Sequence, residues 1–241
     1  MVRAPPVFLE QARDRWERLL TALLPVAMAE RRRAAHRQRA FETIERERRW
    51  GDGPASGWGS TLDYTRVARD IIVEVVQRHE VRSILDLPCG DFAWMPKVLE
   101  QLDPGLRYVG GDIVPALIAR NAAANPGLEF RQIDFVHDPL PACDLIVCRE
   151  ALQHLPVADI ARALRNFSAS GARLLLTSIH LRRTGWRNGQ ECRVGRCRDR
   201  NLILPPFNLP DPIAIYAERD PKHKFLGLWD LPFADRAPRA R

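Results

Sequence analysis

The sequence predicts an α/β fold built around one mostly parallel β-sheet. Between residues 61 and 179, short segments rich in Ile, Leu and Val alternate with segments of helical periodicity. Such alternation produces parallel strands, because each helix returns the chain across a face of the sheet. Two later strand candidates, 213–218 and 224–231, are joined by a link of five residues that suits an antiparallel hairpin. We therefore expect seven strands, parallel except for this hairpin, with helices on both faces.

The first 50 residues are expected to form a helical extension outside this sheet. Residues 8–24 place apolar side chains on one helical face, and Pro25 is expected to break or kink the chain. Residues 29–50 consist mainly of Arg, Glu and Ala, with Glu–Arg pairs four residues apart that favour a solvated helix. This arm could bind nucleic acid, but its interleaved acidic residues favour packing on the core or on a partner.

The main domain, residues 51–241, begins with a loop that carries four glycines between residues 51 and 60. A helix is expected over 61–79, capped near Ser60 or Thr61 with Asp63 in its first turn. The remaining expected strands cover 82–87, 107–111, 128–133, 143–148 and 172–179, and the remaining expected helices cover 94–102, 114–124 and 157–169. Residues 181–212 are basic, proline-rich and too long for a plain connection, so we expect a functional loop beside the site.

The composition is that of a soluble globular protein, with 46% hydrophobic and 28% charged residues. No apolar run is long enough to cross a bilayer and no signal peptide is recognisable, so we expect no membrane association and a cytoplasmic location. The five cysteines fit free thiols, and Cys192 with Cys197 lacks the further ligands of a zinc set, so no metal is expected. The net charge of +7 lies in two arginine-rich ends, which could meet anionic partners or simply be solvated.

Acidic residues stand at the ends of the first two expected strands. Asp86 lies near the end of segment 82–87, and Asp112 follows segment 107–111. In open α/β sheets, the carboxyl ends of neighbouring parallel strands meet at the crevice where nucleoside cofactors bind. A dinucleotide fingerprint needs three glycines, of which only Gly90 is present in this turn. The absence of the other two glycines argues against a bound pyrophosphate.

The same residues fit S-adenosylmethionine better. Gly90 lets the backbone pass close to a methionyl group, and the acidic turn suits a sulfonium cation. Asp112 is placed to accept hydrogen bonds from both ribose hydroxyls, and Asp134 with Phe135, after the third strand, to hold the adenine. Each residue has a structural alternative, since the carboxylates could cap helices and Phe135 could be a core residue.

Several motifs resemble those of class I S-adenosylmethionine-dependent methyltransferases, and more narrowly those of a bacterial and algal branch of that class. The resemblance is carried by SGWGS at 56–60, ILDLPCGDFAWM at 84–95, and the segments 108–118, 144–155, 170–177, 206–212 and 226–229. It covers roughly residues 50–231 and implies a Rossmann-like fold with S-adenosylmethionine as cofactor. The residues expected to bind this cofactor are Asp86, Pro88, Cys89, Gly90, Asp91, Asp112, Ile113, Asp134, Phe135 and Arg149. Residues 191–202 depart from the pattern of the branch, which leaves the substrate open.

The candidate catalytic residues follow the fourth strand. Glu150 and His154 stand four apart and would share one face of a helix, where either could take a proton from a methyl acceptor. His154 could equally make a structural hydrogen bond, and Arg149 could pair with Glu150 or bind the cofactor carboxylate. His180, at the end of the fifth strand, is a third base candidate. The residues expected to bind substrate are Trp58, Trp94, His180 and Arg198.

We expect methyl transfer to an oxygen or nitrogen acceptor on a small or glycan-like substrate, which could be anionic because arginines crowd residues 182–198. The alternative is a non-catalytic or RNA-directed protein of the same fold, whose basic ends bind nucleic acid or a protein partner. The tetrapeptide Asn/Asp-Pro-Pro-Tyr/Phe of many amino-group methylases does not follow the fourth strand, which lowers the expectation of base methylation. The sequence does not indicate an oligomeric state.

Overall fold

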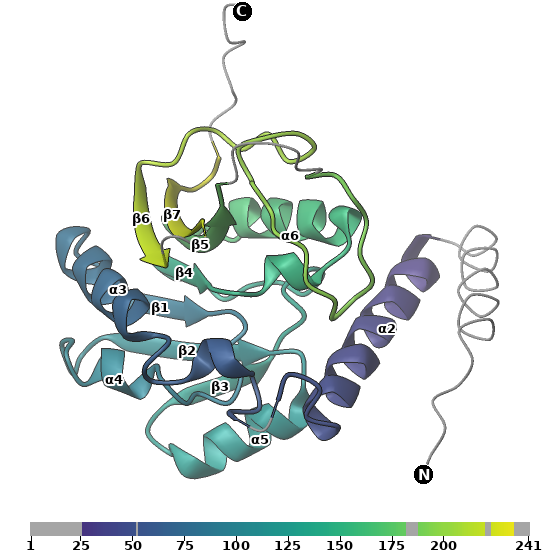
Figure 1. The fold of residues 1–241 in the computed structure, drawn as a ribbon. Helices are drawn as coiled ribbons and strands as arrows, with labels where there is room; N and C mark the ends of the chain where they lie inside the picture. The colour runs from purple at the N-terminus through teal and green to yellow at the C-terminus, as the bar shows by residue number, and fades with distance from the viewer. Residues whose placement is uncertain (1–25, 52, 182–187, 220–222, 234–241) are drawn as a thin grey trace, which may run out of the picture.

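The computed structural model describes residues 26–51, 53–181, 188–219 and 223–233 (Figure 1). The helix expected over 8–24 and part of the expected loop 181–212 lie outside the described residues. The described chain forms one sheet of seven strands in the order β3-β2-β1-β4-β5-β7-β6. The strands are β1 (Ser83–Asp86), β2 (Arg107–Asp112), β3 (Glu129–Gln132), β4 (Leu145–Cys148), β5 (Leu174–His180), β6 (Ala214–Arg219) and β7 (Lys224–Asp230).

The strand directions confirm the expected topology. β1 pairs in parallel with β2 and β4, and the parallel pairs continue to β3 on one side and to β5 on the other. β7 runs antiparallel to β5, and β6 completes the hairpin. The C-terminal ends of β1, β2, β3 and β4 therefore meet at one edge of the sheet.

Both faces of the central strands are buried. In β4, Leu145 and Val147 join one apolar cluster, while Ile146 and Cys148 join the cluster on the other face. This alternation follows from the two-residue period of a strand, and burial on both faces explains the continuous apolar run in the sequence.

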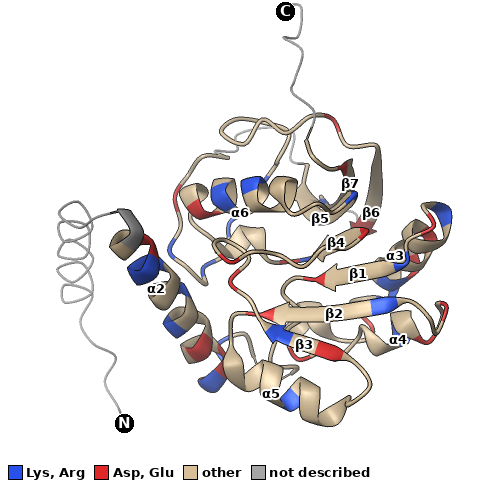
Figure 2. Ribbon diagram, turned by 180° about the vertical axis from the view of Figure 1, so that it is seen from behind, with Lys and Arg blue, Asp and Glu red and all other residues tan. Residues whose placement is uncertain are grey.

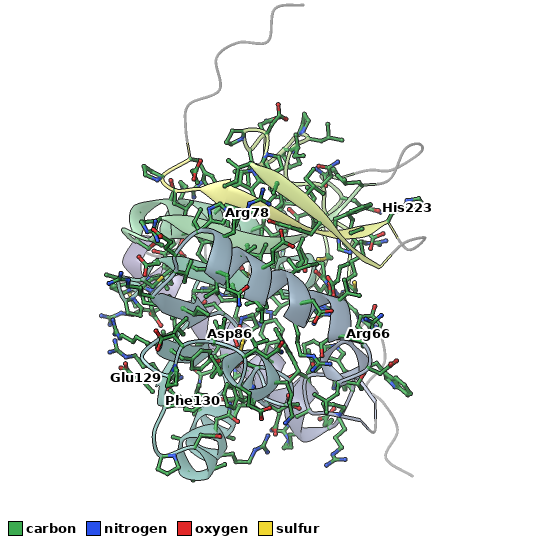
Figure 3. The ribbon with its side chains drawn as sticks, turned by 90° about the vertical axis from the view of Figure 1, so that its left-hand side faces the viewer. Arg66, Arg78, Asp86, Glu129, Phe130 and His223 are labelled. Atoms are coloured by element: carbon green, nitrogen blue, oxygen red, sulfur yellow. The ribbon has the colours of Figure 1, made fainter. Side chains whose placement is uncertain are left out.

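Helices cover the two faces of the sheet. They are α3 (Arg66–Arg78), α4 (Pro96–Leu99), α5 (Pro115–Ala124) and α6 (Val157–Ala169). Apolar side chains of α3 and α4 belong to one core cluster, and those of α6 belong to the other. Figure 3 labels Arg66 and Arg78 at the two ends of α3 and shows this helix lying across the face nearest the viewer.

Two helices are shorter than the sequence predicts. α3 begins at Arg66, because residues 61–65 form turns in which the Thr61 hydroxyl accepts a hydrogen bond from the Tyr64 backbone N–H at 3.2 Å. The expected cap at Ser60 or Thr61 is therefore wrong. α4 ends at Leu99 because the next backbone N–H groups, including that of Leu102, bond three residues back rather than four.

The N-terminal helix α2 (Val26–Arg46) packs against the main domain rather than standing in solvent. It lies beside the C-terminal ends of the parallel strands, whose arrowheads point toward it in both Figure 1 and Figure 2. Phe41 packs against the core cluster that includes α6, and Arg37 is among the largest fully buried side chains. The sequence predicted the helix but allowed several positions for it. In the described residues, no helix is both long and apolar enough to cross a membrane.

Candidate active site

A cavity lies where the C-terminal ends of the parallel strands meet α2, and we call it the strand-end cavity. Its lining includes Arg37, Phe41, Glu45, Trp50, Pro88, Cys89, Gly90, Trp94, Asp112, Ile113, Asp134, Phe135, Arg149, Glu150 and His154. Most of the residues that the sequence predicted for the site are thus brought together. The predicted residues outside the lining are Asp86, Asp91, Trp58, His180 and Arg198.

The turn after β1 is held against the end of β2 by a carboxylate. Asp112 accepts hydrogen bonds from the backbone N–H groups of Gly90 at 3.1 Å and Val114 at 2.9 Å. Burial raises the pKa of Asp112 to about 6, although these hydrogen bonds favour the charged form. Gly90 has φ +55°, and a Cβ atom there would lie 2.1 Å from the Ser56 hydroxyl oxygen. Glycine is therefore required at this position for both conformation and space.

The two other acids of the turn act behind the cavity wall. The Tyr108 hydroxyl donates to Asp86 at 2.9 Å, and burial raises the pKa of Asp86 to about 7. Asp91 accepts from the Ser56 backbone N–H at 3.3 Å and from its hydroxyl at 3.2 Å. Asp91 thereby ties the loop before α3 to the turn after β1. This loop is the SGWGS segment, which places Ser56 on the cavity.

Asp134, expected to hold an adenine, is engaged by an arginine that the sequence analysis missed. The Arg37 guanidinium donates to both carboxylate oxygens of Asp134, the shortest distance being 2.6 Å, and also to Asp159 at 3.1 Å. Burial lowers the pKa of Arg37, but the two carboxylates outweigh it and raise that pKa above the ordinary value. Burial raises the pKa of Asp134, which Arg37 only partly offsets. No signal in the sequence distinguishes Arg37 from the other arginines of α2.

Arg149 pairs with Glu218 and not with Glu150, which is one of the two partners expected from the sequence. Its Nε donates to Glu218 on β6 at 2.8 Å, and its Nη1 donates to the Gly59 carbonyl at 2.8 Å. The guanidinium lies 5.5 Å from the ring centre of Trp94 and 5.9 Å from that of Tyr64. Arg149 therefore joins the loop before α3 to the C-terminal hairpin while still lining the cavity.

Glu150 stands at the end of β4 in a left-handed conformation, with φ 55°. It is followed by a 3-10 turn (Leu152–His154) and not by the helix that the spacing of Glu150 and His154 suggested. Lys224 of β7 lies 2.6 Å from its Oε2. Burial alone raises the pKa of Glu150, but the charges of Lys224 and Arg149 outweigh it and hold that pKa at about 2. Glu150 is therefore ionised throughout the neutral range.

His154 lines the same cavity and packs against an aromatic residue from the N-terminal arm, with the two rings tilted by 37°. The ring centres of His154 and Trp50 are 5.0 Å apart. Burial lowers the pKa of His154, although Glu150 and a backbone hydrogen bond at Arg196 favour the charged ring. The imidazole is therefore neutral at pH 7. Sequence reasoning missed both Trp50 and Lys224, because neither lies near the motifs that mark the site.

Three predicted substrate-binding residues lie away from the cavity. The Nδ1 of His180 accepts a hydrogen bond from the Arg200 backbone N–H at 3.2 Å, and its Nε2 lies 3.6 Å from Asp199, which ties β5 to the loop that follows. Trp58 is 71% exposed. The Arg198 side chain is exposed, although its backbone N–H donates to Gln153 at 2.9 Å. In the described part of the chain, no group of His, Cys, Asp and Glu side chains could hold a metal ion.

Comparison with known proteins agrees with the family resemblance seen in the sequence motifs. A family described as "Methyltransferase domain" matches residues 85–171, which run from β1 past the end of α6. No significant sequence relative was found among curated proteins. Among solved structures, the chain is similar to the N-methyltransferase NodS from Bradyrhizobium japonicum in complex with S-adenosyl-L-homocysteine. The TM-score is 0.55 at 15% identity, covering 82% of this chain and 99% of NodS.

The chain is also similar to human N-acetylserotonin methyltransferase in complex with SAM, with a TM-score of 0.53 and 15% identity over 88% of this chain and 61% of the human chain. The S-adenosylmethionine-dependent methyltransferase SibL gives a TM-score of 0.52 and 15% identity, covering 70% of this chain and 56% of SibL. At these identities the similarity concerns the fold. Together with the family match, it confirms the resemblance to class I methyltransferases, the class that uses S-adenosylmethionine.

Proposed function

Because the chain has the class I methyltransferase fold and contains a methyltransferase-domain match, we propose that it transfers a methyl group from S-adenosylmethionine to an oxygen or nitrogen acceptor on a small or glycan-like molecule. One observation carries this proposal. The strand-end cavity joins the Gly90–Asp112 turn, which suits the cofactor, to Glu150 and His154, which suit an acceptor. The cavity therefore offers both reactants one continuous space.

The residues of the cavity fit the proposed cofactor. Gly90 has no side chain where a Cβ would collide with Ser56, so the backbone there can approach a ligand closely. Asp112 lines the cavity, where it would accept hydrogen bonds from the ribose hydroxyls, and Asp86 lies behind it; both are buried carboxylates with raised pKa values. A nearby cation favours the ionised form of a buried carboxylate. The sulfonium of S-adenosylmethionine would supply such a cation.

The adenine end of the cofactor is assigned to the α2 side of the cavity. Ile113 and Phe135 line the cavity there and offer apolar surface to an adenine. Asp134 shares this wall, but its carboxylate is taken up by Arg37. We therefore assign Asp134 to holding α2 in place, with adenine contacts coming chiefly from the two apolar residues.

Methyl transfer is an in-line displacement in which alignment supplies most of the rate enhancement. When bound, S-adenosylmethionine would supply an electrophilic methyl group, which passes to the acceptor while the electron pair of the broken C–S bond stays on sulfur. His154 is neutral at pH 7 and lines the cavity, so it suits removal of the acceptor proton. Glu150 is a weak base because its pKa is about 2, and it suits binding of the acceptor.

Calorimetry with S-adenosylhomocysteine tests this proposal. The intact protein should bind this product analogue, and transfer of label from S-adenosylmethionine to a component of cell extract should follow. Absence of binding at concentrations well above micromolar would refute the enzyme assignment.

The alternative, a protein that uses its basic ends to bind RNA, remains a second candidate because α2 carries a row of basic side chains (Figure 2). An RNA-directed role predicts an affinity for RNA that falls steeply with salt concentration. Acidic side chains also lie along α2, and its most buried arginine, Arg37, faces Asp134 and Asp159 inside the protein. These contacts favour the small-molecule proposal.

A further inference from the structure

Glu150 and His154 both line the strand-end cavity, and each has one buried polar atom that lacks a hydrogen-bond partner among the described residues. These atoms are Oε1 of Glu150 and Nδ1 of His154. Buried polar atoms are nearly always hydrogen-bonded, because leaving one unpaired costs about 1–3 kcal/mol. Two such atoms on residues that line one cavity therefore mark the place where a ligand supplies hydrogen-bonding groups.

One oxygen of the Glu150 carboxylate is paired with a cation, and the other has no hydrogen-bond partner among the described residues. Its Oε2 takes the Lys224 ammonium at 2.6 Å, and its backbone N–H donates to the Ser178 hydroxyl at 2.9 Å. The left-handed backbone of Glu150 is unfavourable for a residue with a side chain, and such strain concentrates at functional sites. The Lys224 ion pair and the backbone hydrogen bond to Ser178 thus restrict the Glu150 side chain, and the Gln153 side chain also helps to lower its pKa.

Lys224 contacts Glu150 but not the cavity. The side chain is buried. Its ammonium lies 3.3 Å from the Tyr64 hydroxyl and 4.8 Å from the centre of the same ring. The antiparallel pairing of β5 and β7 places Lys224 opposite His180. The Lys224 ammonium therefore lies near the end of β4, where it contacts Glu150.

His154 provides the second atom of the pair. Nδ1 is buried and has no hydrogen-bond partner among the described residues, so it is the ring nitrogen left for a ligand. The Trp50 ring packs against the imidazole and limits its rotation.

We propose that Glu150 Oε1 and His154 Nδ1 together bind the reacting group of the acceptor, an uncharged primary amine, and that Lys224 is the positioning residue that orients Glu150. This inference rests on the proposed methyltransferase function and extends it to the acceptor. A primary amine has two N–H groups, so it can donate one to Glu150 Oε1 and the other to His154 Nδ1, whereas a hydroxyl could donate to only one of them. The amine nitrogen forms the new bond to the methyl carbon, the electron pair of the broken C–S bond stays on sulfur, and the proton leaves to His154 Nδ1. A reacting group that is itself an anion would face the ionised Glu150.

Charges elsewhere in the cavity agree with an uncharged reacting group. The arginines that line it are Arg37 and Arg149, and both are paired with carboxylates. The described loop arginines Arg193, Arg196 and Arg198 do not line the cavity. If the substrate is anionic, its charge therefore lies on a part remote from the methylated atom.

Sinefungin tests the proposal without a known acceptor. This analogue of S-adenosylhomocysteine carries an amino group where the transferable methyl group would be. Its ammonium should bond to Glu150 Oε1, so the intact protein should bind sinefungin about tenfold or more tightly than S-adenosylhomocysteine. In Glu150→Gln this preference should fall to about onefold while S-adenosylhomocysteine affinity is retained.

Binding of S-adenosylhomocysteine tests the proposed function, and the preference for sinefungin tests the acceptor proposal. If S-adenosylhomocysteine does not bind, the proposed function fails. If it binds but sinefungin shows no preference, or Glu150→Gln keeps the preference, the acceptor proposal is overturned while the proposed function stands.

Titration of the His154 ring by NMR tests the role of Lys224. The charged groups near His154 are Glu150, Lys224 and His180. Lys224→Met removes a cation and unmasks the carboxylate, so the pKa of His154 should move upward, and Lys224→Arg should keep it near the wild-type value. An unchanged pKa in Lys224→Met, or the same upward shift in both variants, would show that Lys224 does not control Glu150.

Discussion

The two ends of the strand-end cavity use their charges differently. At the α2 end, Arg37 satisfies Asp134 and Asp159 in one buried network. At the β4 end, Lys224 satisfies only one oxygen of Glu150, and the Nδ1 of His154 has no partner in the described part of the chain. A completed network contributes to a fixed structure, whereas an incomplete one keeps groups available for a ligand. We therefore assign the α2 end to closing the cavity and the β4 end to chemistry.

The largest predicted effect comes from breaking the completed network. Arg37→Met would leave Asp134 and Asp159 buried without their cation, which should cost about 3–5 kcal/mol of unfolding free energy. Arg33→Met, which removes a half-exposed arginine of the same helix, should cost less than about 0.5 kcal/mol. Urea unfolding of both variants measures the difference.

Adding Asp134→Asn and Asp159→Asn to Arg37→Met should restore part of the lost stability, because no uncompensated charge remains. Equal stability of Arg37→Met and the wild type would show that α2 is not held by this network.

The next largest effect concerns cofactor affinity. Asp112→Asn removes the charge proposed to receive the ribose hydroxyls, so S-adenosylhomocysteine should bind about 100-fold more weakly. Asp70→Asn on the exposed surface of α3 is the matched control and should bind normally. Calorimetry gives both constants, and circular dichroism verifies that the variants are folded. Unchanged affinity in Asp112→Asn would remove Asp112 from the site.

Cofactor affinity should also depend on pH. Burial raises the pKa of Asp112 to about 6, above the unfolded value near 3.8. The stability that this raised pKa contributes to the ligand-free protein is therefore present below about pH 4 and lost as the pH rises through about 6. Binding favours the ionised carboxylate, so affinity for S-adenosylhomocysteine should fall by up to about tenfold per pH unit below about 6. Calorimetry from pH 5 to pH 8 tests this, and a flat profile would contradict the assignment.

The smallest predicted effect concerns Trp50, which connects the N-terminal arm to the β4 end of the strand-end cavity. Trp50→Ala removes the ring that packs on His154, which should weaken sinefungin binding by about fivefold because aromatic pairs contribute about 0.5–1.5 kcal/mol. Trp50→Phe should retain most of the affinity. Identical constants for all three proteins would show that the N-terminal arm does not order the β4 end.

The cofactor end of the site could be predicted from the sequence because its signals are local. Gly90 and Asp112 stand at the ends of strands that hydrophobicity identifies, and parallel pairing brings such ends together. The helix expected over Glu150 and His154 did not form, because the chain after β4 turns sharply at Glu150. Both side chains nevertheless line one cavity.

The other contributors could not be predicted, because their contacts depend on tertiary packing. Arg37 is one of many arginines in α2, and only the position of that helix singles it out. Trp50 reaches His154 for the same reason. Lys224 left one signal, since it is a charged residue directly before an apolar run in β7, but its partner depends on the register between β5 and β7.

A crystal structure of the protein with sinefungin tests the central claim most directly. We predict that the ligand fills the strand-end cavity, with its ribose hydroxyls on Asp112 and its amino group within hydrogen-bond distance of Glu150 Oε1 and His154 Nδ1. The Arg37–Asp134 contact should remain in place in the complex. A ligand bound elsewhere, or an amino group directed away from Glu150 and His154, would contradict this account of the site.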